Sequence, residues 1–223
     1  MGLVLNDGVD ERAPRGWPLV LMGIAALTDD VPRVVLDAAS LQLSIEDDGG
    51  AFQAWAFDVP MPLDGDVVLD DAKAQFEVTW ALRGDQTEAL PLGRYTARLS
   101  LGDQTSPPVT IEVVDLAPTS DPVESATRTR RRAGLEARVA LLRADAPAAL
   151  SAVDTALAEV PDDVALLVWR GKANAAADRV EDALFDFDTA DARVRAENDS
   201  GEPAVTISEN RRPVLERYFQ GAR

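Results

Sequence analysis

The side chains that could do chemistry in this sequence are mainly carboxylates, hydroxyls and guanidinium groups, because the chain contains no His and no Cys. Their absence removes the commonest general base and metal ligand, every thiol nucleophile, disulfide bonds and Cys-based metal sites. The enzymatic alternative is a carboxylate hydrolase, such as a glycosidase, which needs two facing carboxyl groups. No motif among the 39 acidic residues marks such a pair. The sequence therefore predicts a non-enzymatic protein with no catalytic residues, no metal and no cofactor.

Acidic residues gather where the chain also has turn-forming glycines. A calcium site requires six to eight oxygen ligands, and the chain has no Asp-x-Asp-x-Asp-Gly loop. Asp and Gly are favoured in turns for local backbone reasons. We therefore expect turn residues rather than metal ligands at Asp47-Asp48-Gly49, Asp64-Gly65-Asp66 and Asp70-Asp71.

Charge is unevenly divided between the two halves of the chain. The formal net charge is −17, of which −13 falls in residues 1–120 and −4 in residues 121–223. An acidic protein repels nucleic acids and anionic membrane surfaces, so both are poor partners. The basic run from Arg128 to Arg132 is expected to neutralise the neighbouring acidic domain rather than to bind nucleic acid.

No apolar stretch has the length of a membrane-spanning helix. The longest run, Trp17 to Leu27, contains Pro18 and Gly23, and acidic residues precede it where a secretory signal would be basic. We therefore expect no membrane insertion. The expected location is the cytoplasm, or the cell envelope if a leader was removed.

The first half of the sequence has the alternation of short β-strands. Apolar and polar residues alternate in four runs, which are separated by turn residues: 41–45, 76–82, 95–101 and 109–113. A further run, residues 51–59, is also expected to be a strand. Regular short strands with such turns favour an antiparallel sandwich, with Trp55 and Trp80 in its core.

The segment from Leu90 to Ala97 contains Pro91, Gly93 and Tyr95. This Pro-x-Gly-x-Tyr pattern resembles the entry into a late strand of bacterial immunoglobulin-like domains. The resemblance implies that the glycine allows a sharp approach of the chain and that the Tyr95 ring packs at the corner. It is carried by residues 76–116 and extends to about residues 15–116, although the Cys pair of antibody-type domains is absent. We expect an immunoglobulin-like β-sandwich over residues 1–118.

The composition changes after this segment. Pro, Thr, Ser and Asp predict a linker over 119–127, and the sequence from Arg128 onward is rich in Ala, Leu, Arg and Glu, which favours helices. The helical half nearly repeats itself. The stretch ALSAVDTA at 149–156 returns as ALFDFDTA at 183–190, and five of the eight positions are identical.

The spacing of these two stretches matches the period of about 34 residues that defines one tetratricopeptide helix–turn–helix unit, and the helical half resembles that family. The resemblance gives two units, residues 130–163 and 164–197. It implies that Gly171 lets two helices of the second unit approach, while Phe187 fills the groove between them. The small residues expected around this groove are Ala183 and Ala190, and the corresponding residues of the first unit are Ala137, Ala149, Val153 and Ala156.

Three positions depart from the family pattern. Ala137 stands at the glycine position of the first unit, Asn174 at a tyrosine position, and Arg195 at the terminating proline position. The first unit keeps this proline as Pro161, and an Asp that follows it, residue 162 or 163, is expected to cap the next helix. An unrelated helical bundle with a duplicated hairpin is the alternative fold.

In tetratricopeptide arrays the ligand lies in a concave groove lined by the first helix of each unit. The resemblance therefore implies a groove with three basic residues in an otherwise acidic protein, and we expect a protein or acidic peptide as the partner. The groove residues that the pattern assigns are Arg131, Arg138 and Leu141 from the first unit and Val168, Lys172 and Ala175 from the second. A solvated helix face, with its arginines paired to acidic residues, is the alternative.

Two units leave open ends that something must cover. We expect residues 213–220, which place Leu215, Tyr218 and Phe219 on one face, to form a capping helix; the β domain or a second copy of the chain are the alternatives. The expected function is recognition of a partner. The alternative is a structural or assembly subunit that dimerises or docks through its helical half.

Overall fold

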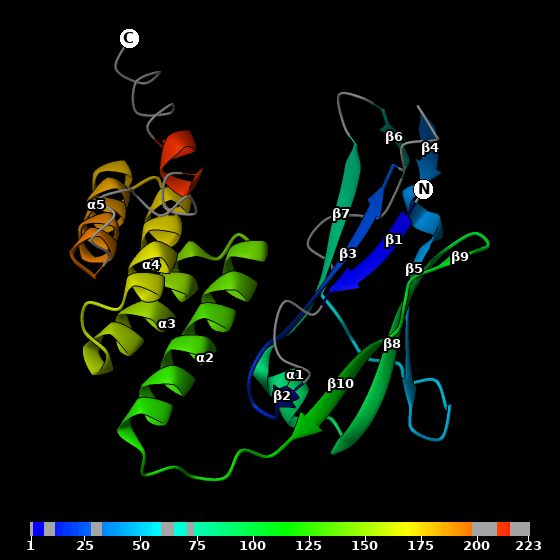
Figure 1. The fold of residues 1–223 in the computed structure, drawn as a ribbon, viewed down its shortest axis with the longest axis horizontal. Helices are drawn as coiled ribbons and strands as arrows, with labels where there is room; N and C mark the ends of the chain where they lie inside the picture. Colours follow the sequence, from blue (N-terminus) through cyan, green and yellow to red (C-terminus); the bar gives the residue numbers. More distant parts are fainter. Residues whose placement is uncertain are drawn as a thin grey trace. The chain divides into compact units, whose positions relative to one another are not determined.

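The computed structural model describes residues 2–6 (backbone only), 12–27, 33–58, 65–70, 74–197 and 209–214. The chain divides into two compact units, Met1–Ala117 and Pro118–Arg223, which we call the strand-rich unit and the helical unit. The expected order of strands followed by helices is confirmed (Figure 1).

Two sheets and a separate strand pair make up the strand-rich unit. The first sheet has the order β1-β3-β7 and the second the order β2-β10-β8-β5, with β9 paired to β8, while β4 pairs with β6. The strands are β1 (Gly2–Asn6), β2 (Arg12–Pro14), β3 (Leu19–Ala26), β4 (Val34–Asp37), β5 (Leu41–Asp47), β6 (Asp66–Leu69), β7 (Gln75–Leu82), β8 (Gly93–Leu101), β9 (Gln104–Thr105) and β10 (Val109–Val114). A 3₁₀ turn covers Ala38–Ser40, and the short helix α1 covers Gly84–Glu88.

The two sheets share one apolar core. Alternate residues of β7 and β8 are buried, as the sequence alternation predicted. Gly23 of β3 marks a close approach, because a Cβ there would lie 2.7 Å from the Trp80 ring and 2.8 Å from Leu99. Residues from both sheets therefore contact one another, and Trp80 lies in the core as expected.

The expected strand over 51–59 is wrong for its described part. Residues 51–58 are irregular and make only isolated bridges, from Phe52 to Glu46 and from Asp58 to Ala81; Val59 lies outside the described residues. The reason is that the segment leaves β5 and reaches β7, which belongs to the other sheet. As a result Phe52 is exposed and Trp55 is half-buried, with its ring 4.9 Å from the Tyr95 ring.

One strand pair differs from the antiparallel expectation. The short strand β2 pairs with β10 in parallel, with Arg12 opposite Glu112. This pairing places an N-terminal strand beside the last strand of the unit. The run Trp17 to Leu27, which was not assigned to a strand, contains β3 at the centre of its sheet.

Four helices form two antiparallel hairpins in the helical unit. They are α2 (Pro122–Leu142), α3 (Ala146–Glu159), α4 (Val164–Ala176) and α5 (Val180–Glu197), and residues 209–214 are also helical. Asp121, Asp145 and Asp163 cap the first three of these helices through their side chains. Because α2 begins at Pro122, residues 122–127 of the expected linker are helical.

The period of the sequence repeat is also present in the backbone. Helix α5 begins 34 residues after α3 begins, and α4 ends 34 residues after α2 ends. This is also the spacing of the two repeated stretches. The turn within each hairpin has a left-handed residue at matching positions, Ala144 with φ 57° and Asp178 with φ 59°. The amide that follows bonds in each case to the carbonyl group five residues earlier, at Ala140 and at Asn174. The two hairpins therefore have the same turn.

The identical residues of the repeat have matching roles. Ala149 and Ala183 are fully buried, and the hydroxyl groups of Thr155 and Thr189 each donate to the carbonyl oxygen four residues earlier at 2.8 Å. The two repeated aspartates each pair with an arginine of the following helix, Asp154 with Arg170 at 3.7 Å and Asp188 with Arg211 at 2.8 Å.

Residues 209–214 cover the last hairpin. Val214 is buried in the same apolar cluster as Phe187. The described helix begins before the expected capping segment 213–220, and the apolar residues proposed for it, Leu215, Tyr218 and Phe219, lie outside the described residues.

Candidate functional site

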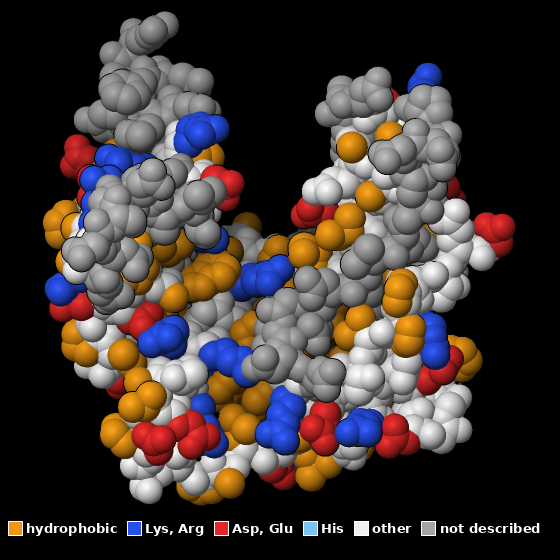
Figure 2. All heavy atoms as spheres, in the orientation of Figure 1, with side chains coloured by type: hydrophobic (Ala, Val, Ile, Leu, Met, Phe, Trp, Pro, Cys, Tyr) orange, Lys and Arg blue, Asp and Glu red, His pale blue; other side chains and the backbone are white. Residues whose placement is uncertain are grey.

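The structure brings Arg138 and Lys172 together from two neighbouring helices, α2 and α4. Their charges are close enough for Arg138 to affect the titration of Lys172. The Lys172 Nζ atom lies 4.4 Å from the centre of the Trp169 ring, which is a cation–π contact. Basic side chains lie beside hydrophobic ones on the face of the helical unit that Figure 2 shows. We call Arg138, Trp169 and Lys172 the basic site.

Both cations are held in an unfavourable environment. Burial lowers the pKa of Arg138, and burial together with the nearby Arg138 charge lowers the pKa of Lys172. Within the described part of the chain, no carboxylate lies within ion-pair distance of either group. An anion bound between them would relieve both effects.

The lowered Lys172 pKa predicts a pH dependence of stability. Folding disfavours the protonated Lys172 amine. The resulting loss of stability is fully present at pH values below the pKa of the folded protein and disappears at pH values above the ordinary pKa of 10.5. Between these values the unfolded chain binds more protons, and stability rises with pH. We expect Lys172→Met to remove this contribution, which urea unfolding at several pH values below 10.5 would detect. An unchanged pH dependence would contradict the lowered pKa.

The other four residues assigned to the groove lie in different settings. Leu141 packs against the core of the first hairpin, whereas Val168 packs against the cluster that contains the buried Ala175. Arg131 is half-buried and precedes Arg138 by two helical turns. The three apolar residues therefore serve packing. Of the six residues assigned to the groove, only the basic ones have side chains that could bind a charged ligand.

The sequence pattern assigned neither Trp169 nor Gly134 to the groove. A Cβ at Gly134 of α2 would lie 3.1 Å from the Trp169 Nε1 atom, so the small residue gives space for the indole. The sequence did contain a signal for this contact, because Gly134 lies inside a helical segment. A glycine at such a position often makes room for a neighbouring side chain.

The basic run near the start of α2 has partners within the helical unit itself. Arg128 pairs with Glu124, Arg130 with Asp163, and Arg132 with Glu136 at 2.8 Å. These three arginines therefore have acidic partners on α2 and at the cap of α4. The bond from Arg130 reaches the cap of α4 and links the two hairpins.

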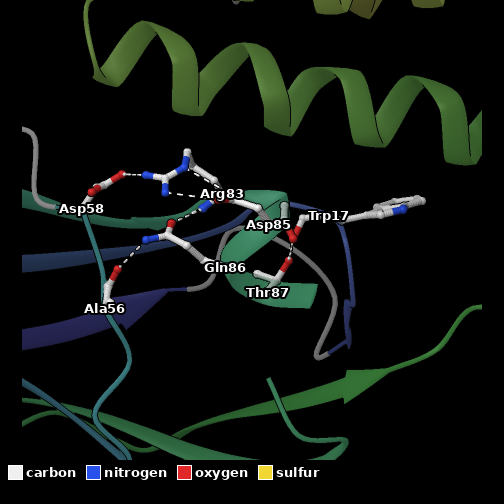
Figure 3. Close-up of polar contacts among 8 residues, drawn as sticks. Trp17, Ala56, Asp58, Arg83, Asp85, Gln86 and Thr87 are labelled. Carbon is white, nitrogen blue, oxygen red and sulfur yellow. Dashed lines mark hydrogen bonds and ion pairs between the residues drawn. The ribbon is translucent and has the colours of Figure 1, made fainter. Parts of the chain in front are cut away.

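A second polar cluster lies around α1 in the strand-rich unit (Figure 3). Arg83 bonds to Asp58 at 2.9 Å and to Asp85 at 3.1 Å. The Gln86 side chain accepts from the Arg83 amide and donates to the Ala56 carbonyl. These bonds attach the irregular segment 51–58 to α1, so the cluster has a structural role.

The buried Thr87 extends this cluster to the loop before β3. Its Oγ1 atom lies 2.6 Å from the Trp17 carbonyl oxygen. We expect Thr87→Val to lower the free energy of unfolding by about 1–3 kcal/mol, because it leaves the part-buried Trp17 carbonyl group without its donor. Thermal unfolding followed by near-UV circular dichroism would measure the loss. Thr87→Ser keeps the hydroxyl group and should lose less; equal losses would argue against the hydrogen bond.

The first acidic cluster acts within a turn, as expected, whereas Asp66 begins strand β6. Asp47 Oδ1 accepts from the amides of Gly49 and Ala51 at 2.9 Å, and Asp47 Oδ2 accepts from Gln53. Asp64 and Asp71 lie outside the described residues. Among the residues that are described, no group of three acidic side chains is arranged to hold a metal ion.

Comparison of the chain with models of known protein families gives no match, and comparison with curated proteins gives none either. In the described ranges, no helix combines the length and apolar character needed to span a bilayer.

Proposed function

We propose that this protein is a non-enzymatic interaction protein whose helical unit is a short tetratricopeptide-like array that binds an acidic segment of a protein partner. The observation that carries the proposal is the basic site. Two helices contribute one cation each, no carboxylate of the described residues neutralises them, and an indole lies beside them. Such a site favours a carboxylate of the ligand through charge-assisted hydrogen bonds.

The tetratricopeptide assignment is supported by the repeated hairpin geometry. Gly171 and Phe187 are in contact, because a Cβ at position 171 would lie 2.7 Å from the Phe187 ring. The small residues around them, Ala183 and Ala190, are fully buried. These are the contacts that the family pattern requires of its glycine, aromatic and alanine positions.

For the strand-rich unit we propose an immunoglobulin-like sandwich. The Tyr95 hydroxyl donates to the Pro91 carbonyl at 2.9 Å, which is similar to the tyrosine corner of immunoglobulin-like domains. Gly93 between them has φ 149°, a value that L-residues rarely adopt. In this proposal the strand-rich unit accompanies the helical unit, which provides the recognition surface.

The recognition proposal predicts a loss of binding on charge reversal. We expect Arg138→Glu/Lys172→Glu to weaken binding of Asp- and Glu-rich peptides by at least about tenfold, since one hydrogen bond to a charged group contributes about 1.5–3 kcal/mol. Titrations of synthetic acidic peptides, followed by tryptophan fluorescence, would measure the affinity.

The control is Arg179→Glu, which reverses one exposed arginine just before α5, outside the basic site. It should retain the wild-type affinity. Equal weakening by both variants would indicate a general effect of net charge, and acidic peptides that fail to bind the wild type would contradict the proposal.

A second candidate function is assembly through the helical unit. The observation that favours it is an open groove of about 660 Å³ between α2 and α3, which involves neither cation of the basic site.

A further inference from the structure

The groove between α2 and α3 has a floor of small side chains and a charged rim. Ala133 and Ala140 line it from α2, and Ala148 and Ala152 line it from α3. Arg132 and Glu159 lie at its edge, and Arg132 and Ala148 are exposed. Small side chains allow another helix to approach closely, at an interaxial distance of about 8 Å.

The equivalent face of the second hairpin is an interface. The repeat relates Ala133, Ala140 and Ala152 of the first hairpin to Leu167, Asn174 and Asp186 of the second, all three of which are buried. Asn174 and Asp186 are bonded to each other, and Arg170, which bonds to Asp186, also pairs with Asp154 of α3. Leu167 lies in the apolar cluster of Phe187 and Val214. The same face of a hairpin is therefore covered in the second hairpin and open in the first.

We infer that two copies of this chain associate through their α2–α3 grooves about a twofold axis. Head-to-tail stacking would require the outer face of the second hairpin of another copy. Residues 209–214 already cover that face, where Val214 is buried and Arg211 pairs with Asp188. Of these two faces of the described helices, the groove between α2 and α3 is the open one. A surface that meets its own copy forms a closed twofold dimer.

The charges of the groove suit association with itself. A net charge of −17 opposes the approach of two copies, but the rim carries Arg132 as well as Glu136 and Glu159. The Arg132 side chain, which pairs with Glu136 of its own helix, is 53% exposed and keeps further N–H donors. Across a twofold axis these donors can face Glu159 of the other copy. Because α3 spans about 21 Å, the interface is small and its dissociation constant is expected in the micromolar range or weaker.

This inference rests on the proposed role of the helical unit in interaction, but it uses a different set of residues from the basic site. The variant Arg138→Glu/Lys172→Glu should lose peptide binding and keep the dimer. Failure of one proposal is thereby distinguishable from failure of the other.

Sedimentation equilibrium of the full chain over a wide concentration range tests the dimer. We expect a monomer–dimer equilibrium for the wild type and a dissociation constant raised at least about tenfold by Ala152→Arg, which fills the groove with a charged side chain. The control is Ala158→Arg, which places the same side chain at an exposed position of α3 outside the groove. Far-UV circular dichroism checks that both variants are folded.

Exchange of the rim charges tests the reciprocal pairing. Arg132→Glu and Glu159→Arg should each weaken the dimer, and the double variant should restore most of the loss. If the wild type stays monomeric over the whole concentration range, the inference is overturned. A helix of another protein then becomes the expected occupant of the groove. Ala152→Arg with unchanged association would overturn it as well, and a double variant no better than the single ones would overturn the twofold pairing.

Discussion

Replacing Phe187 with Ala should lower the free energy of unfolding of the helical unit by about 3–5 kcal/mol. The side chain is 1% exposed and is the largest of the fully buried ones. It fills the space that Gly171 of α4 leaves, so its removal creates a cavity between α4 and α5. Urea unfolding followed by far-UV circular dichroism, where the helices dominate the signal, would measure the loss.

The control lies two residues away on the same helix. Phe185 is 67% exposed, and Phe185→Ala should change the free energy of unfolding by no more than about 0.5 kcal/mol. The pair separates the packing contribution of an aromatic residue from its helix propensity. Similar losses for both variants would show that the contact between Gly171 and Phe187 does not hold the hairpin together.

Replacing Asp186 with Ala should lower the free energy of unfolding by about 3 kcal/mol. Asp186 is 1% exposed, and its carboxylate accepts from Arg170 at 2.6 and 2.9 Å and from Asn174 at 2.9 Å. Removal of the carboxylate leaves both donors without this acceptor. We place the loss at the lower end for buried pairs because the Arg170 side chain is 29% exposed and can reach water.

Two comparisons isolate this buried network. Asp188→Ala breaks the exposed pair with Arg211 and should cost less than about 1 kcal/mol. The triple variant Arg170→Met/Asn174→Ala/Asp186→Leu replaces the whole network with apolar groups, and we expect it to be at least as stable as Asp186→Ala. Urea unfolding curves of the three variants at neutral pH would measure these differences in the free energy of unfolding. Equal stability of Asp186→Ala and the wild type would show that the network contributes nothing.

The buried network bears on the departure at position 174. Asn174 stands where the tetratricopeptide pattern has an aromatic residue, and its amide bonds to Asp186 on the next helix. In the first hairpin the corresponding positions are Ala140 and Ala152, which line the open groove. The two hairpins therefore differ at these positions: the second has a buried polar network where the first has small residues that line a groove.

Much of the local structure could be predicted from the sequence. The alternation over β5, β7, β8 and β10 placed those strands, because side chains of a strand point to opposite faces and only one face is buried. Spacing of small and aromatic residues placed the helices of both hairpins. The Asp residues before α2, α3 and α4 are ordinary caps, although only the one before α4 was anticipated.

Other features depended on contacts between distant segments. Residues 51–58 have the composition of a strand but leave β5 for β7. The short helix α1 is attached by bonds to Trp17 and Ala56, which are remote in the sequence. Local patterns carry no information about such partners, so the strand expectation failed there.

The sequence by itself determined the order of strands and helices, the period of the helical repeat and the absence of His and Cys chemistry. Each of these follows from residue type and local spacing, which fix how a side chain points from its own element. Only the tertiary structure decided that Lys172 lies against the Trp169 ring, that Asp186 is buried with Arg170, and that the groove between α2 and α3 is open. Those features depend on where separate helices lie relative to one another, which packing across the whole unit sets.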